Sequence, residues 1–119
     1  MLRHNHKLYI KERLKRRNDI KVFFNKESNI KRVGNYYYTV LMLKNNRSYS
    51  RFAVAVKRNK AKAVKRNKAK RIVREIYRLE KDNIPIGYDY FIIVNKIDID
   101  NSFLFDNVRK NLLDLLQKV

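Results

Sequence analysis

The chain of 119 residues contains no cysteine and no tryptophan, and it has only one proline and two glycines. The lack of cysteine excludes disulfides, thiolate zinc sites and cysteine nucleophiles. With Gly34 and Gly87 as its only glycines, the chain has no glycine-rich phosphate loop. Acidic residues number only 11, and neither a Ser–His–Asp arrangement nor a paired acidic dyad is visible. The residues alone therefore predict a binding protein with no catalytic residues and no metal ligands of its own.

Long apolar segments are also missing. No uncharged apolar run reaches the roughly 18 residues that a membrane span needs, and no apolar stretch of a secretory signal follows Arg3. We therefore expect a cytoplasmic protein without a membrane partner. Its length and 45% hydrophobic content predict a single domain, 1–119. Residues 1–17 would form a basic, partly mobile N-terminal arm, to which His4 and His6 belong rather than to a metal site.

Positive charge is what the sequence has in excess. The 30 Lys and Arg residues give a formal net charge of +19. Residues 57–78 carry eleven bases and one acid, whereas 79–119 carry five bases and seven acids. A charge concentrated in this way repels itself in the folded state and favours a polyanionic partner bound at a defined face.

Hydrophobic patterning predicts an α+β fold, an α/β sandwich in which helices pack on a small sheet in the order αββαβα. With one further, optional strand the sheet would be of four-stranded type, in the order αββ(β)αβα. Residues 35–44 and 49–56 have the composition and alternation of two strands, and we expect them to pair as a hairpin. "YDYFIIV", at 88–94, is apolar on both faces and predicts a strand covered on two sides. We expect three helices: one that begins with Asn18 as its cap, one at 62–81 and one at 102–118. Asp98 and Asp100 are capping candidates for the last helix. The alternative is that these two acids bind magnesium.

An octapeptide occurs twice without change, as "AVKRNKAKAVKRNKAK" at 55–70. The first copy continues a period-2 pattern, in which Phe52, Val54 and Val56 alternate with alanines. The second copy leads into "RIVREIYRLEKD", where apolar residues recur at helical spacing. Copies eight residues apart would also lie about 80° apart on one helix. We therefore expect the first copy to end a strand and enter a loop, and the second to open a helix.

That helix predicts a nucleic-acid contact. Arg66, Lys70, Arg74 and Arg78 are four residues apart and form a row that phosphates could match. The alternative is an ordinary solvated helix surface. Aromatic residues in the expected strands could stack unpaired bases on an open sheet face, or could instead be core residues.

The sequence resembles a known family around this helix. "RFAVAVKRNKAKAVKRNKAKRIVRE" is similar to the signature region of the bacterial ribonuclease P protein component, and "RLKRRNDIKVFF" and "IPIGYDYFIIV" extend the similarity. The resemblance implies a left-handed βαβ crossover containing the basic helix. It also implies that a catalytic ribonuclease P RNA, using Mg²⁺ held mainly by RNA and substrate, removes the 5′ leader from precursor tRNA. The protein would bind the single-stranded leader and the catalytic RNA, and no small-molecule substrate.

The same resemblance assigns two groups of residues. The RNA-docking motif would consist of Arg66, Asn67, Lys68, Lys70, Arg71 and Arg74. The leader-binding cleft would contain Phe24, Ile20, Tyr36, Tyr38 and Lys57. Ile20 stands where the family has a second aromatic residue, and Lys68 stands where it has an arginine, which removes the bidentate fork.

Three other functions stay open from the sequence. A ribosomal or other structured-RNA-binding protein would use the same basic helix without a leader cleft. A DNA-binding nucleoid protein would also need the positive charge. A protein-only nuclease ranks last, because no acidic cluster is visible.

Overall fold

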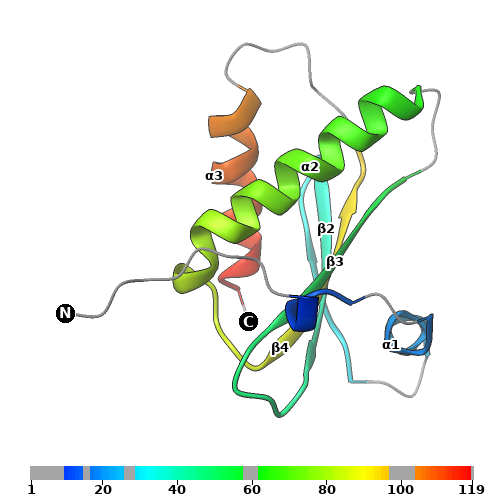
Figure 1. Cartoon of the computed structure of the whole chain (residues 1–119), viewed down its shortest axis with the longest axis vertical. Helices are drawn as coiled ribbons and strands as arrows, with labels where there is room; N and C mark the ends of the chain where they lie inside the picture. Colours follow the sequence, from blue (N-terminus) through cyan, green and yellow to red (C-terminus); the bar gives the residue numbers. More distant parts are fainter. Residues whose placement is uncertain (1–9, 15–16, 26–28, 58–61, 97–103, 119) are drawn as a thin grey trace.

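The computed structural model describes residues 10–14, 17–25, 29–57, 62–96 and 104–118, and the side chains of Ile10 and of 104–107 are not included. A four-stranded mixed sheet has helices α2 and α3 on one face and α1 on the other (Figure 1). The strands are β1 (Lys31–Gly34), β2 (Tyr38–Lys44), β3 (Arg51–Val56) and β4 (Tyr88–Val94). The helices are α1 (Arg17–Lys21), α2 (Ala63–Glu80) and α3 (Leu104–Leu116), with single 3₁₀ turns η1 (Ile10–Glu12), η2 (Val22–Phe24) and η3 (Lys81–Asn83). The predicted α+β class is confirmed.

The sheet order is β1-β2-β4-β3, so the expected hairpin of 35–44 with 49–56 is wrong. β4 lies between the two strands and pairs antiparallel with β2 and parallel with β3. A strand that is apolar on both faces is most stable in the centre of a sheet, and β4 takes that place. The parallel neighbours β3 and β4 are joined through α2, which packs on the sheet.

The hairpin is formed instead by β1 and β2. The strand β1, Lys31-Arg32-Val33-Gly34, has no apolar alternation, which is why it is only the optional strand of the predicted order. The side chain of Asn35 stabilises the turn, because its Oδ1 accepts the N–H groups of Tyr37 at 2.9 Å and Tyr38 at 2.8 Å. This is the local turn that asparagine favours.

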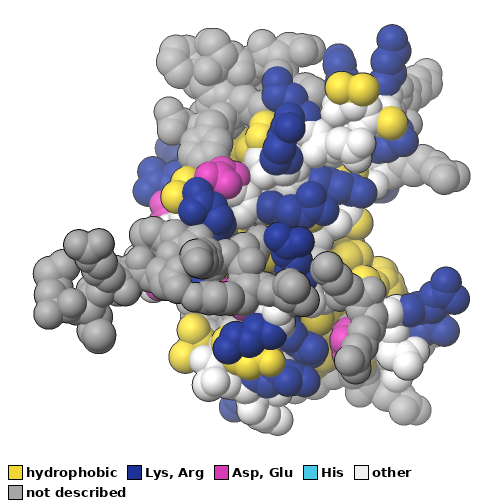
Figure 2. Space-filling model, viewed as in Figure 1, with side chains coloured by type: hydrophobic (Ala, Val, Ile, Leu, Met, Phe, Trp, Pro, Cys, Tyr) yellow, Lys and Arg dark blue, Asp and Glu magenta, His cyan; other side chains and the backbone are white. Residues whose placement is uncertain are grey.

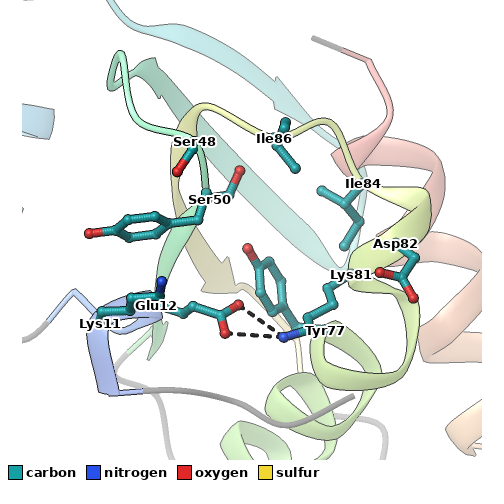
Figure 3. Close-up of a pocket in the computed structure, with 10 residues that line it drawn as sticks. Lys11, Glu12, Ser48, Ser50, Tyr77, Lys81, Asp82, Ile84 and Ile86 are labelled. Carbon is teal, nitrogen blue, oxygen red and sulfur yellow. Dashed lines mark hydrogen bonds and ion pairs between the residues drawn. The ribbon is translucent and has the colours of Figure 1, made fainter. Parts of the chain in front are cut away.

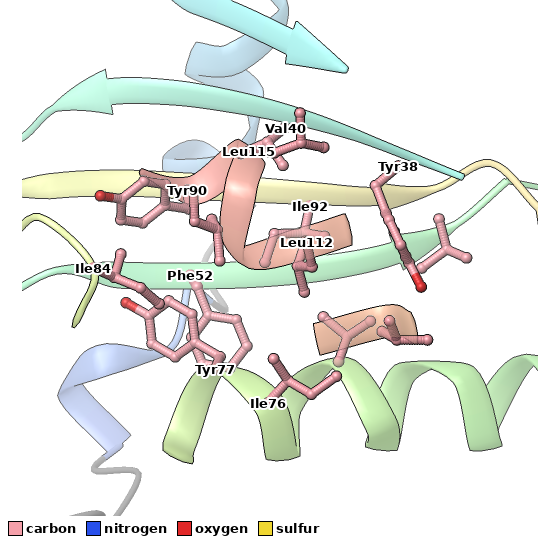
Figure 4. Close-up of a cluster of buried hydrophobic side chains, with 14 of the residues drawn as sticks. Tyr38, Val40, Phe52, Ile76, Tyr77, Ile84, Tyr90, Ile92, Leu112 and Leu115 are labelled. Atoms are coloured by element: carbon pink, nitrogen blue, oxygen red, sulfur yellow. The ribbon is translucent and has the colours of Figure 1, made fainter. Parts of the chain in front are cut away.

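The main core lies between the sheet and the helices α2 and α3 (Figure 4). Ile76 and Leu112 have no exposed surface, and Phe52 of β3 stacks on Tyr77 of α2 with ring centroids 4.1 Å apart. Tyr77 belongs to the buried stripe of α2, whereas Leu79 of the same helix is 39% exposed. The other face carries a smaller cluster, in which Phe23 packs against Phe91 at 5.7 Å.

The two octapeptide copies differ as expected wherever they are described. Ala55 and Val56 end β3, and the whole second copy, 63–70, lies in α2. The first helix begins at Arg17, so Asn18 lies inside it and is not its cap, while Asp19 is in its first turn. His4, His6, Asp98, Asp100 and most of the N-terminal arm lie outside the described residues. Within the described part of the chain, no helix is long and apolar enough to cross a membrane.

Candidate nucleic-acid interface

The basic surface is centred on α2. The expected docking motif lies entirely outside the buried stripe of this helix: Asn67, Lys68, Arg71 and Arg74 are exposed, and Arg66 and Lys70 are half-buried. In Figure 2, lysine and arginine side chains follow the length of α2 across the molecule. The density of cations on one exposed face is that of a phosphate-binding surface.

The motif divides into two rows around the helix. At about 100° per residue, Arg66, Lys70 and Arg74 follow one border of the buried stripe. This border faces β3, because Arg74 lines a groove with β3 residues and Tyr77, on the same side, stacks on Phe52. Arg71 lies farther round, on the outer surface of the helix. A polyanion could therefore contact α2 from outside and at the β3 edge.

Arg78, the last member of the predicted row, is bound by an acid of its own helix. Its Nε donates to Glu75 Oε2 at 3.1 Å, and its terminal nitrogen also contacts that carboxylate. The hydrogen bond from Arg78 lowers the pKa of Glu75, and the same bond raises the pKa of Arg78. Glu75 therefore partly offsets the positive charge of Arg78.

Beside α2, the opposite face of the sheet is only partly covered. Ala53 and Ala55 of β3 share this face with their register partners Phe91 and Ile93 of β4. The turn η2 covers Phe91 through Phe23, whereas Ala55 and Ile93 remain half-exposed. The two alanines leave space along β3. Apolar surface is visible between α2 and α1 in Figure 2.

A groove with a volume of about 310 Å³ follows this edge of the sheet. Its floor includes Ala53, Ala55 and Phe91, and its sides include Ile20 of α1 and Arg74 of α2. The groove therefore joins the open sheet face to the basic helix. We call it the sheet-edge groove.

Three expected cleft residues lie at or near this groove. Ile20 lines it, half-buried. Phe24 is 65% exposed, and its ring meets Phe91 edge-on at 5.7 Å and 85°. Lys57 is exposed directly after β3, where its N–H donates to Val94 O at 2.9 Å. By strand alternation its side chain leaves on the same face as Ala55.

The two tyrosines expected in the cleft are separated. Tyr36 is 65% exposed in the β1–β2 turn, and Lys96 Nζ lies 5.5 Å from its ring centroid. Tyr38 is only 5% exposed and belongs to the main core under α2 and α3. Its placement in the cleft is therefore wrong. Adjacent residues of a strand point to opposite faces, so a shift of one residue along this strand reverses the face on which a tyrosine lies.

A polar cluster that the sequence did not predict holds α1 against the sheet. Asp89 of β4 is 3% exposed and accepts from Arg51 at 2.9 and 2.6 Å and from Asn45 at 2.8 Å. Arg51 NH1 also lies 3.7 Å from Asp19 of α1. The bond to Asp89 raises the pKa of Arg51. A lone acid in the apolar run "YDYFIIV" was the available signal, because a buried carboxylate requires a partner.

The described residues include no group of three or more His, Asp and Glu that could hold a metal ion. A basic helix beside a partly open sheet face with exposed aromatic rings is typical of a nucleic-acid-binding α+β protein. The candidate interface therefore consists of the cations of α2 and the exposed aromatic side chains beside the open sheet face.

The comparisons with known proteins identify the family. The family model "Ribonuclease P" matches residues 8–119, and the chain belongs to the ribonuclease P protein family. The ribonuclease P protein component of Thermotoga maritima is 40% identical over 112 residues, 92% of each chain. That of Petrotoga mobilis is 33% identical over the same coverage.

Solved structures agree. The ribonuclease P protein from Thermotoga maritima has a TM-score of 0.76 at 41% identity and covers 91% of this chain and 97% of its own. The Staphylococcus aureus protein has a TM-score of 0.73 at 24% identity, covering 89% and 93%, and shares the fold. Family membership implies a part in the ribonuclease P endoribonuclease of tRNA processing, together with an RNA partner.

Proposed function

We propose that this chain is the protein subunit of a ribonuclease P in which RNA is the catalyst. The protein binds the catalytic RNA through α2 and holds the single-stranded 5′ leader of precursor tRNA on the open sheet face. The observation that carries this proposal is the sheet-edge groove, because it brings the half-exposed Ile20 and Ala55 together with Arg74 of α2.

The docking role of α2 rests on its exposed charges. Arg71 and Arg74 are exposed, and guanidinium groups bind phosphate oxygens in a bidentate manner. Lys68 contributes a point charge only. Each phosphate neutralised releases counterions, so binding of the catalytic RNA should weaken steeply with salt.

The leader role rests on the groove and on the exposed ring of Phe24, which contacts the groove residue Phe91. Phe24 presents a largely exposed face on which an unpaired base can stack, and such a contact tolerates different bases. Ile20 supplies apolar contact, and Lys57 supplies a charge for the leader backbone at the end of β3. Tyr36 offers a second exposed ring just before β2, at the end of the sheet where β3 ends, and Lys96 Nζ lies near this ring.

Magnesium is held mainly by the catalytic RNA and the substrate in this proposal, and it supplies charge stabilisation and activation of water for the hydrolysis. The protein acts on this chemistry by positioning the precursor and by reducing repulsion between the two RNAs. We place the complex in the cytoplasm, where precursor tRNA is processed.

The test is reconstitution. The chain is mixed with a bacterial ribonuclease P RNA and a 5′-labelled precursor tRNA at a magnesium concentration too low for the RNA alone. We expect cleavage at the mature 5′ end only when both components are present. RNA binding without stimulated cleavage would instead indicate a structured-RNA-binding protein outside ribonuclease P. Equal binding to duplex DNA would indicate a nucleoid protein.

A further inference from the structure

A second cavity lies near the C-terminal end of α2. It has a volume of about 250 Å³ and is formed by η1, the loop before β3, the end of α2 and the segment before β4 (Figure 3). None of its lining residues lines the sheet-edge groove. This volume is below the roughly 300 Å³ at which sites for drug-sized ligands begin, and it suits one small ring system.

One side of the cavity carries a fixed ion pair. Lys81 Nζ lies 3.1 and 3.3 Å from the two carboxylate oxygens of Glu12, and the two side chains are only 15% and 9% exposed. The pair ties η1 to the residue after α2. The carboxylate is thus held in one position at the cavity wall, and a carboxylate offers about four acceptor sites in all.

Tyr77 gives the cavity a hydroxyl group. The residue is 1% exposed, and its ring is fixed by stacking on Phe52 at 4.1 Å. Figure 3 shows the hydroxyl pointing into the space between Glu12 and Ile84. It forms no hydrogen bond with any residue in the described part of the chain, whereas the neighbouring Tyr90 hydroxyl donates to Pro85 O at 2.6 Å. Among the described residues no buried side-chain nitrogen or oxygen lacks a partner, so this hydroxyl keeps accessible surface in the cavity, where a ligand can reach it.

The remaining walls are apolar or aromatic. Ile84 and Ile86 lie across the cavity from Glu12 and Lys81 in Figure 3, and Ile86 is 66% exposed. Tyr49 also lines the cavity, with Lys11 Nζ 4.5 Å from its ring centroid. A ligand with flat apolar faces and a hydrogen-bonding edge would match both kinds of wall.

The charge of the cavity differs from that of the chain. Lys11 and Lys81 line it together with Glu12 and Asp82, so its formal charges balance in a protein of net charge +19. A free phosphate gains little here compared with the surface of α2. The cavity therefore favours a neutral ligand.

We propose that this cavity binds one unpaired nucleobase of the RNA partner, an inference that rests on the proposed function. The faces of the base lie against Tyr49 and the isoleucines. Its edge meets the Tyr77 hydroxyl and the Glu12 carboxylate, which accepts from an exocyclic amino group. Cytosine, adenine and guanine carry such a group and bind, whereas uracil does not and binds most weakly.

The experiment titrates the full chain with neutral nucleosides, which avoids the phosphate affinity of α2. Isoleucine δ1-methyl NMR signals report each site separately: Ile84 and Ile86 for this cavity, Ile20 for the sheet-edge groove and Ile76 for the core. We expect saturable shifts at Ile84 and Ile86 with cytidine, adenosine or guanosine, and smaller shifts with uridine. No shift at these methyls up to the solubility limit would overturn the proposal.

Variants then test the two polar groups. Tyr77→Phe and Glu12→Gln should each weaken the binding measured at Ile84 and Ile86 by about two- to tenfold, the range for one hydrogen bond. Tyr37→Phe is the matched control, since it removes a tyrosine hydroxyl outside the cavity, and it should change nothing. Unchanged affinity in both cavity variants would overturn the assignment. The unchanged Ile76 signal verifies that each variant is folded.

A parallel cleavage assay separates this proposal from the proposed function. Stimulated cleavage by the wild-type chain without nucleoside shifts would refute the base-binding cavity alone. Nucleoside shifts without stimulated cleavage would leave a base-binding cavity in a protein with another RNA partner. In the complex, Tyr77→Phe should reduce RNA affinity without changing the salt slope, because no phosphate contact is lost.

Discussion

The two faces of the sheet are built differently. On the α2 and α3 side, fifteen buried residues form one continuous cluster, whereas the α1 side has a buried cluster of four, counted over the described residues. Val40, Ile76 and Leu112 on the first side have no exposed surface, while Ile20, Ala55 and Ile93 on the second are half-exposed. The helix side therefore supplies most of the hydrophobic stabilisation, since this grows with buried apolar area.

This difference means that one face of the sheet stabilises the fold while the other is available for binding. A face that contributes little to the core can leave rings and alanines exposed without large cost to the fold. In the described part of the chain, the short helix α1, the turn η2 and the Arg51–Asp89 cluster cover that face, and they leave the end around Ala55 half-exposed.

The largest effect is expected in the main core. Ile76→Ala should lower the free energy of unfolding by about 2–5 kcal/mol, because it leaves a cavity at a site with no exposed surface. The matched substitution Ile20→Ala on the other face should cost no more than about 1 kcal/mol. Urea denaturation measures both. Equal losses would contradict the unequal contribution of the two faces.

Alkaline pH should also act on the helix side. Burial raises the pKa of Tyr77 and Tyr90 above the ordinary value of 10.0. Below pH 10 both states keep these protons, but above it only the unfolded state loses them, so stability falls as pH rises. The loss is about 1.4 kcal/mol per tyrosine at pH 11. Tyr77→Phe should reduce the loss of unfolding free energy between pH 8 and pH 11 by the amount that one tyrosine contributes. An unchanged pH dependence would contradict the raised pKa of Tyr77.

The octapeptide repeat provides a control for the docking surface. Arg66→Ala combined with Lys68→Ala should lower the salt dependence of binding to the catalytic RNA by about two units of slope, one per lost cation. Arg58→Ala with Lys60→Ala makes the same change in the first copy, which precedes the start of α2 at Ala63 in the sequence, and should matter less. Filter binding between about 50 and 200 mM salt measures both slopes. Equal effects would remove the special role of α2.

The most confined effect is expected at Phe24. Phe24→Ala should weaken leader-dependent binding by about 1–3 kcal/mol if its ring stacks one base. Because the ring is 65% exposed, stability should change by no more than about 0.5 kcal/mol. Affinity for precursor tRNA is compared with affinity for mature tRNA, alongside urea denaturation. A larger loss of stability than of binding would make Phe24 a core residue.

Sequence patterns predicted the elements that are long and strongly periodic. The helix expected at 62–81 is Ala63–Glu80, and the strand expected at 88–94 has the same bounds in the structure. The two identical octapeptides were distinguished because their flanking residues differ. Local pattern decides such cases, since the buried stripe or the alternation continues beyond the repeat.

The pairing of the strands, and the sheet face on which each side chain lies, could not be predicted from local patterns. β3 pairs with β4 rather than with its neighbour in sequence, because long-range burial of β4 on both faces outweighs the preference for adjacent hairpins. Tyr38 and Tyr36 are two residues apart, but the turn at Asn35 places only Tyr38 in a strand. The cluster of Arg51, Asp89 and Asp19 joins three distant segments, and no local pattern contains that information.

The central claim is that the open sheet face binds the 5′ leader, and leader length tests it most directly. The affinity of the reconstituted complex is measured for precursor tRNAs whose leaders range from none to about ten nucleotides, with and without the protein. The account predicts that the protein raises affinity with each added nucleotide until the groove is filled, and that Phe24→Ala removes part of this gain. An affinity independent of leader length would contradict it.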